Sequence, residues 1–157
     1  MKIVSTFLIV SAMLAAIAGA VAHEYTAVGI KIVHPWTRAT PPGATTAVAY
    51  VKISNTGQTP LRLIGGTTPV AARVEIHDMS MDGGVMRMRP VPGVDIAPGS
   101  TVEFKAGGLH LMLVGLNRQL MQEDLVPLTL QFANGAKVSI ELYVEGMGAG
   151  GGDHDHP

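Results

Sequence analysis

The 157-residue sequence contains no cysteine. Disulfide bonds, thiolate zinc sites and cysteine nucleophiles are therefore excluded, and so is a blue-copper electron-transfer centre, which needs a cysteine thiolate. Charged residues are also few, at 15% of the chain, and the formal net charge is only −1. A chain so nearly neutral lacks the basic face that binds nucleic acid and the positive charge that attracts a protein to anionic membranes.

A sustained helical period is absent, and short β-branched runs instead alternate with Gly, Pro and Asn. The pair Asn134-Gly135 lies between two alternating runs and predicts a hairpin. Many short strands between frequent turns indicate an all-β domain, either an antiparallel sandwich or a barrel. Residues 117–124 are expected to form one short helical turn. The predicted strands are residues 28–33, 47–54, 61–67, 72–79, 85–91, 101–104, 110–115, 128–132 and 137–144.

The first 22 residues have the pattern of a signal peptide, with Lys2 followed by an almost unbroken apolar run to Ala18. The sequence Ala20-Val21-Ala22 fits a small-x-small cleavage site, so that His23 becomes the first residue. The alternative is that this segment is kept as a membrane anchor, since its length is close to that of a spanning helix. No later segment is long and apolar enough to span a membrane. We expect a periplasmic protein with one β domain at residues 23–145 and a flexible Gly- and His-rich tail at residues 146–157.

Methionine, in contrast, is abundant, with nine residues, of which five fall between positions 79 and 112. Alternate residues of a strand point to the same face, so His110 and Met112 leave one strand together and His77 and Met79 another. A hairpin around Asp82-Gly83-Gly84 would return Met86 and Met88 on a partner strand. Imidazole and thioether groups from three neighbouring strands would then converge.

These ligand types select the metal. Thioether sulfur is soft and neutral and favours Cu(I) over Mg²⁺ or Ca²⁺, whereas zinc prefers thiolate, imidazole or carboxylate. Each residue also has an ordinary interpretation: a methionine in a strand is usually core packing, and His77 could be a surface histidine. A packing role is favoured more strongly for Met79, Met81 and Met86 than for Met88, and as ligands they are interpreted as rim or reserve ligands.

The same residues carry a resemblance to a known family. The sequence resembles the periplasmic copper chaperones called PCuAC (DUF461), whose signature is His, ten residues, Met, twenty-one residues and His-x-Met. His77, Met88, His110 and Met112 match this spacing without a gap. The similarity covers about residues 28–144 and includes the segment His34-Pro35-Trp36-Thr37-Arg38. Some members carry Met directly after the first His, where this chain has Asp78, with Met79 one position further on.

The resemblance implies a cupredoxin-like antiparallel Greek-key β-sandwich or barrel. It implies a solvent-near Cu(I) site formed by His77, Met88, His110 and Met112. It further implies a chaperone, not an enzyme, that passes copper to an acceptor protein. In some bacteria that acceptor is the CuA centre of cytochrome c oxidase subunit II, and other copper chaperones are further candidate partners.

Two further metal sites are weaker predictions. The tail sequence Asp153-His154-Asp155-His156 offers imidazole and carboxylate ligands for Cu(II) or Zn(II), or it is a polar end without a role. The free amine and imidazole of His23 could chelate Cu(II) after cleavage, although an ordinary N-terminus is the favoured interpretation. For His34, Trp36 and Arg38 we favour a structural role, in which the tryptophan packs and the arginine pairs with an acid.

Other functions remain compatible with the same residues. Periplasmic copper buffering or resistance would use the same site, and a copper enzyme could use His23. A structural or adhesion sandwich would bind no metal. The sequence contains no evident Ser-His-Asp set, paired-carboxylate motif, phosphate loop or nucleotide fingerprint, which favours a carrier over an enzyme.

Overall fold

A computed structural model describes residues 24–27 and 29–148 of the chain. Within these residues every regular element is a strand, as the short β-branched runs predict. The strands are β1 (Glu24–Ala27), β2 (Ile30–Arg38), β3 (Thr46–Asn55), β4 (Leu61–Thr67), β5 (Ala71–Asp82), β6 (Val85–Val91), β7 (Val94–Ile96), β8 (Thr101–Phe104), β9 (His110–Leu116), β10 (Leu125–Phe132) and β11 (Lys137–Glu145). In the described part of the chain, no helix reaches the length and apolarity needed to cross a bilayer.

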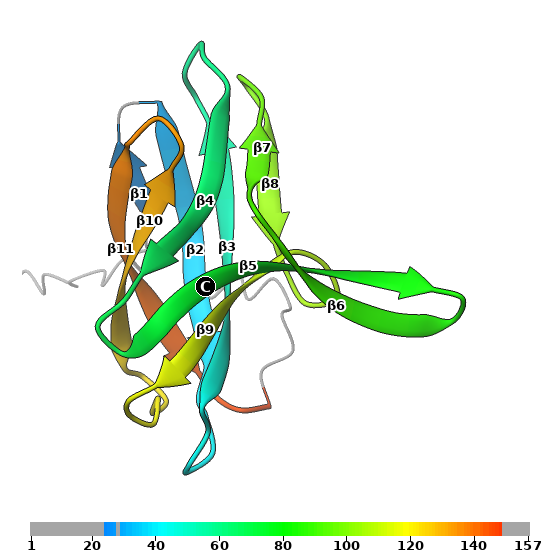
Figure 1. Ribbon diagram of the computed structural model, residues 1–157. Helices are drawn as coiled ribbons and strands as arrows, with labels where there is room; N and C mark the ends of the chain where they lie inside the picture. Colours follow the sequence, from blue (N-terminus) through cyan, green and yellow to red (C-terminus); the bar gives the residue numbers. More distant parts are fainter. Residues whose placement is uncertain (1–23, 28, 149–157) are drawn as a thin grey trace, which may run out of the picture.

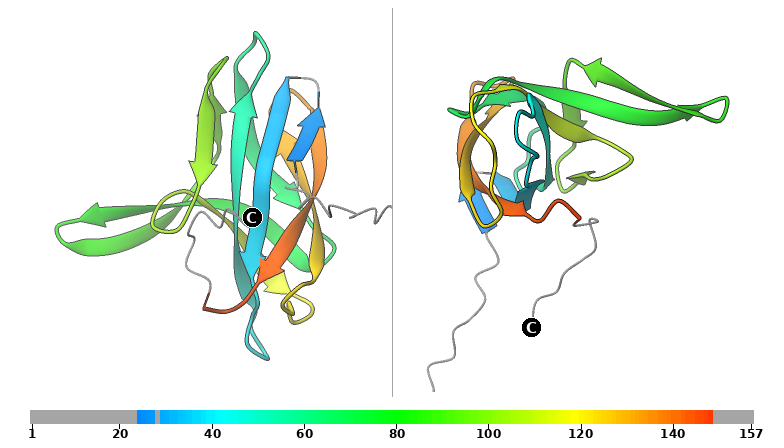
Figure 2. Two further views of the ribbon diagram at one scale, coloured as in Figure 1. Left: turned by 180° about the vertical axis from the view of Figure 1, so that it is seen from behind. Right: turned by 90° about the horizontal axis from the view of Figure 1, so that it is seen from below.

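The strands close into a barrel (Figures 1 and 2). Their order is β2-β11-β10-β4-β5-β9-β3, and β3 pairs back onto β2 to complete the ring. Each of the remaining strands pairs with one strand of the ring: β1 with β2, β8 with β3, β7 with β4 and β6 with β5. Among the described strands, the pair of β2 and β11 is parallel and all the other pairs are antiparallel, in agreement with the predicted antiparallel barrel. Closure removes most of the unpaired strand edges that an open sheet would expose.

The core fills the barrel with alternate residues of each strand. In β3, for example, Ala49, Val51 and Ile53 are buried, while the residues between them lie on the outer face. The same period of two buries Leu111 and Leu113 of β9 and leaves His110 and Met112 on the opposite side. The outer face of β3, β5 and β9 is therefore where the candidate ligands lie.

A bulge in β2 separates two parts of that strand. His34 has a positive φ of 52°, and the register between β2 and β3 shifts between Val33 and Trp36. The extra residue turns Trp36 outward, where its ring lies 4.6 Å from that of Tyr50 and is covered by Arg38. The predicted packing role of the tryptophan is confirmed, and Arg38 packs over the two aromatic rings.

The hairpin of β5 and β6 projects from the barrel (Figure 1). β5 pairs with β9 only as far as His77, so its continuation from Asp78 to Asp82 is paired with β6 alone. The turn is made by Gly83 and Gly84, whose φ angles of 59° and 81° suit a two-residue hairpin. Pro90 is tolerated in β6 because this strand lies at a sheet edge.

The predicted strands at residues 61–67, 85–91 and 101–104 match β4, β6 and β8 residue for residue. β1 and β7 were not predicted, and the first predicted strand, which begins at Val28 outside the described residues, stops short of the bulge. The helical turn predicted at residues 117–124 is wrong. Backbone N–H groups of these residues bond to other segments. The N–H of Leu120 donates to Oγ1 of Thr40, and that of Glu123 donates to the carbonyl of Val144 in β11.

Gly66 shows how tightly the barrel wall is packed. It lies in β4 between β10 and β5, and a Cβ atom built on it would come within 2.7 Å of the carbonyl oxygen of Thr129. We expect Gly66→Ala to destabilise the fold by about 1–3 kcal/mol, because backbone must move to make room. Urea denaturation would measure the loss, with the exposed neighbour Thr67→Ala as control. A variant as stable as the parent chain would contradict this packing.

Candidate metal centre

The register between β5 and β9 brings the two predicted histidines together. His77 is directly opposite His110, and their rings are 5.7 Å apart between centroids. The adjacent pair in the same ladder is Ile76 with Leu111, and both of these residues face the core. The two imidazoles therefore share the outer face, because adjacent pairs of a ladder alternate between faces.

Met88 reaches this pair from β6. It is opposite Met79 on β5, which follows His77 by two residues and so lies on the same face. Its Sδ atom lies 3.1 Å from Nε2 of His110. A thioether and an imidazole nitrogen are thus already in contact, although they are far apart in the sequence.

Met112 completes the predicted set by register. It follows His110 by two residues on β9 and is opposite Glu75 of β5 on one side and Val48 of β3 on the other. Its side chain is partly buried on the same outer face. All four residues of the signature therefore lie on one surface made by β5, β6 and β9.

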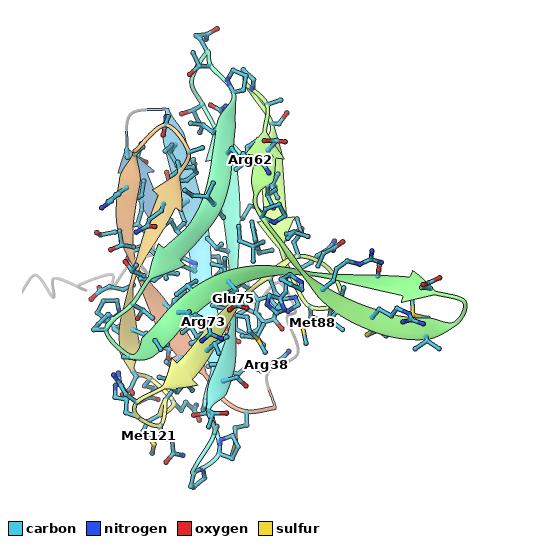
Figure 3. The ribbon with its side chains drawn as sticks, viewed as in Figure 1. Arg38, Arg62, Arg73, Glu75, Met88 and Met121 are labelled. Carbon is cyan, nitrogen blue, oxygen red and sulfur yellow. The ribbon has the colours of Figure 1, made fainter. Side chains whose placement is uncertain are left out.

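Burial of the site is uneven. His110 is only 2% exposed and the side chain of His77 only 13%, whereas Met88 is 50% exposed. The expected position near solvent therefore holds for Met88 but not for His110, which is buried. The imidazoles form its floor, and the thioether of Met88 on the projecting hairpin is its accessible edge (Figure 3).

Hydrogen bonds assign the reactive nitrogen of His110. Its Nδ1 atom lies 3.0 Å from the carbonyl oxygen of Gly108, which can only accept, so Nδ1 carries the proton. In the neutral ring Nε2 then holds the lone pair, and this is the atom in contact with Met88. The same Gly108 carbonyl accepts from the backbone N of Met79, which ties the loop before β9 to β5.

Glu75 plays the corresponding part for His77. Its Oε2 atom accepts a hydrogen bond of 2.9 Å from Nε2 of His77, and its Oε1 atom accepts one of 2.8 Å from Arg73. The bond from Arg73 and then that from His77 lower the pKa of Glu75 below its ordinary value, so the carboxylate stays ionised at neutral pH. Figure 3 shows Arg73 and Glu75 side by side next to β5.

This pairing leaves Nδ1 of His77 buried with no hydrogen-bond partner. An unsatisfied buried nitrogen is costly, and such an atom calls for an explanation. With the proton on Nε2, it is a free lone pair on the neutral ring. A carboxylate that holds the far nitrogen of an imidazole is the usual support of a metal-binding histidine.

The donor set fits a soft monovalent metal. Within the described residues, no three His, Asp or Glu side chains gather in a way that could hold a metal ion, so a hard-ion or zinc site of that type is not formed there. The available donors are instead two neutral imidazole nitrogens and two thioethers. This combination suits Cu(I).

The other predicted ligands have different outcomes. Met79 is directly opposite Met88, and Met81 and Met86 form the next pair toward the tip of the hairpin, all on the same face. His23, His154 and His156 lie outside the described residues. Glu75 was missed in the sequence analysis, although its position two residues before His77 on a strand already placed both side chains on one face.

Comparisons with known proteins identify the family of the chain. The family model described as "Putative lipoprotein LpqE-like" matches residues 30–144. A curated protein of Leifsonia xyli subsp. xyli, named "Putative lipoprotein Lxx21020", is 30% identical over 118 residues, which make up 74% of this chain and 70% of that protein.

Two solved structures are similar over most of the chain. The copper-bound PCuAC domain from PmoF2 has a TM-score of 0.68 and 31% identity, and the match covers 79% of this chain and 98% of that domain. The solution structure of the Cu(I) form of DR1885 from Deinococcus radiodurans has a TM-score of 0.60 and 29% identity, over 82% of this chain and 83% of that one.

The fold is therefore the cupredoxin-like barrel of PCuAC domains, as the resemblance implied. The chain belongs to the LpqE-like family, which is the PCuAC family indicated by the signature spacing.

Proposed function

We propose that this protein is an exported copper chaperone that binds one Cu(I) through His77, Met88, His110 and Met112. The observation that carries the proposal is the pair of oriented imidazoles: Nε2 of His110 already touches Met88, and Nδ1 of His77 is buried and unpaired. The relatives add support, because two of the similar structures are described as copper-bound and Cu(I) forms.

Uptake and release follow from the uneven burial. The buried imidazole of His110 and the partly buried imidazole of His77 hold the metal from below, and the neutral donors keep its single positive charge without a thiolate that would bind it too firmly. Met88 is the exposed ligand on an edge strand, so it is the donor that an incoming ligand can displace first. The metal can then move by ligand exchange with no change of oxidation state, which is the behaviour of a carrier and not of an enzyme.

The proposal extends to residues beyond the described ones. Residues 1–22 act as the signal peptide and place the domain of residues 23–145 in the periplasm. The relative from Leifsonia xyli is named as a lipoprotein, and this name supports export. The tail of residues 146–157 offers His154 and His156 to Cu(II). The acceptor is a copper protein such as the CuA domain of cytochrome c oxidase subunit II.

Anaerobic titration with Cu(I) against a chelator tests the binding, and mixing the loaded protein with an apo CuA domain tests delivery. We expect one tightly held equivalent in the barrel and appearance of copper in the acceptor. Retention of the metal by the loaded protein in the presence of the apo acceptor would favour periplasmic buffering instead. A chain that retains no Cu(I) against a moderate chelator would overturn the proposal.

A further inference from the structure

The hairpin of β5 and β6 has two chemically different faces. One carries polar and charged side chains that satisfy each other: Arg87 lies 3.4 Å from Asp82, and Arg89 donates to Ser80 at 3.1 Å. The opposite face carries four methionines, which form two successive cross-strand pairs. Met79 is opposite Met88, and Met81 is opposite Met86.

The register makes each pair a close one. In an antiparallel ladder counted from a two-residue turn, Asp82 and Val85 form the hydrogen-bonded pair, and the next pair is of the narrower, non-hydrogen-bonded kind. Met81 with Met86 and Met79 with Met88 fall at such positions, where opposite side chains approach most closely. The two pairs are two residues apart along the strand, which is roughly 7 Å.

This face is not part of the core. Met81 and Met86 are 67% and 57% exposed, and the segment that carries them is paired only within the hairpin. Packing therefore does not account for methionine here. Strands favour β-branched and aromatic residues, and an exposed strand favours polar ones, so four thioethers on one face, three of them exposed, run against local preference. Soft metal binding is the property that methionine has and leucine or valine lacks.

We propose that Met79, Met81 and Met86 form a second, weaker Cu(I) site on the hairpin, outside the four-ligand centre. It consists of neutral thioethers alone, without an imidazole, so it holds the metal less firmly than the barrel site. Met79 lies directly opposite Met88, and Met81 and Met86 form the next pair on this face, closer to the tip of the hairpin, where both are exposed.

The position of this site gives it a role in transfer, and this role rests on the proposed function. Cu(I) that leaves His77 and His110 meets Met88 first, and the next sulfur donors along the same face are those of the outer site. Each step replaces one thioether by another and leaves the charge and oxidation state of copper unchanged. The outer site is thus the place from which an acceptor with its own soft ligands takes the metal.

The test uses the chain from residue 23 to residue 157 with ¹³C-labelled methionine methyl groups, titrated anaerobically with Cu(I). The first equivalent is expected to shift the methyl signals of Met88 and Met112, and the second those of Met79, Met81 and Met86. The double variant Met81→Leu with Met86→Leu is expected to lose the second equivalent at the hairpin and keep the first. Leucine is close in volume, so folding is preserved.

Met121 supplies the matched control, because it is also exposed but lies at the other end of the molecule (Figure 3). Met121→Leu should bind both equivalents. Methyl signals of Met81 and Met86 that stay in place through the second equivalent would overturn the outer site, as would a double variant that still takes up both at the hairpin. Failure of the first equivalent to shift Met88 would instead contradict the proposed function, so the two results are distinguishable.

Discussion

His110→Asn is expected to weaken Cu(I) binding by at least about 100-fold, because it removes a ligand, and loss of a supporting contact alone costs about 10–100-fold. Asparagine is chosen because its side-chain NH₂ can still donate to the carbonyl of Gly108, as Nδ1 of His110 does. Only the Nε2 donor beside Met88 is lost. Competition with a calibrated Cu(I) chelator would measure the change.

The control for this variant is His34→Asn. His34 is an exposed histidine in β2 with a φ of 52°, a backbone conformation that asparagine adopts readily. This variant should bind Cu(I) like the parent chain. Thermal melts of both variants without metal should remain close to that of the parent. Undiminished binding by His110→Asn in a folded protein would remove this nitrogen from the site.

Glu75→Gln is expected to lower Cu(I) affinity by about 10–100-fold, which is the range for losing a second-sphere partner of a metal-bound histidine. The glutamate is a positioning residue: its carboxylate accepts from Nε2 of His77 and so leaves Nδ1 free for the metal. Glutamine keeps the shape but offers an NH₂ group and no charge, so the preference for the Nε2-protonated ring is lost.

A purely structural role would not change the protonated nitrogen, so ¹⁵N NMR of the apo protein is the decisive measurement. The ring of His77 should be protonated at Nε2 in the parent chain and mixed between Nε2 and Nδ1 in Glu75→Gln. Glu103→Gln, which removes an exposed carboxylate paired with Lys52 and Lys105, is the control and should leave both readings unchanged. An unaltered His77 tautomer in Glu75→Gln would contradict the positioning role.

The charge of Glu75 also makes the strength of its contacts with Arg73 and His77 depend on pH. Its pKa in the folded protein is lowered by Arg73 and His77, so the stabilising contacts are present above the ordinary pKa of a glutamate. They are lost only as the pH falls through the lowered folded value. At neutral pH the carboxylate is therefore ionised in the parent chain, and the effect of Glu75→Gln is fully visible.

In the proposed site, different residues would hold the metal and release it. The histidines lie on β5 and β9, two strands of the closed barrel that pair with each other at these two residues. Met88 lies on β6, which pairs only with β5. A rigid pair of nitrogen donors next to an accessible sulfur donor is suited to a protein that must both retain and release Cu(I), and the proposed outer thioethers continue this gradient of accessibility.

Local features of the sequence determined most of the strands, several turns and the choice of candidate ligands. A period of two in β3 and β9, paired glycines at positions 83 and 84 and the Asn134-Gly135 turn act over a few residues, so they are readable without a fold. The same holds for placing His110 and Met112 on one face. The spacing of the four ligands added the family.

The tertiary structure alone decided what depends on contacts between distant segments. Closure through the parallel pair of β2 and β11 sets the register of the whole ring, and that register puts His77 opposite His110 and Glu75 opposite Met112. The burial of His110 and the helix-free loop before β10 likewise depend on distant segments, since the loop bonds to Thr40 and Val144. Such pairings are absent from any single stretch of sequence, because each is fixed only when every strand of the barrel has its neighbours.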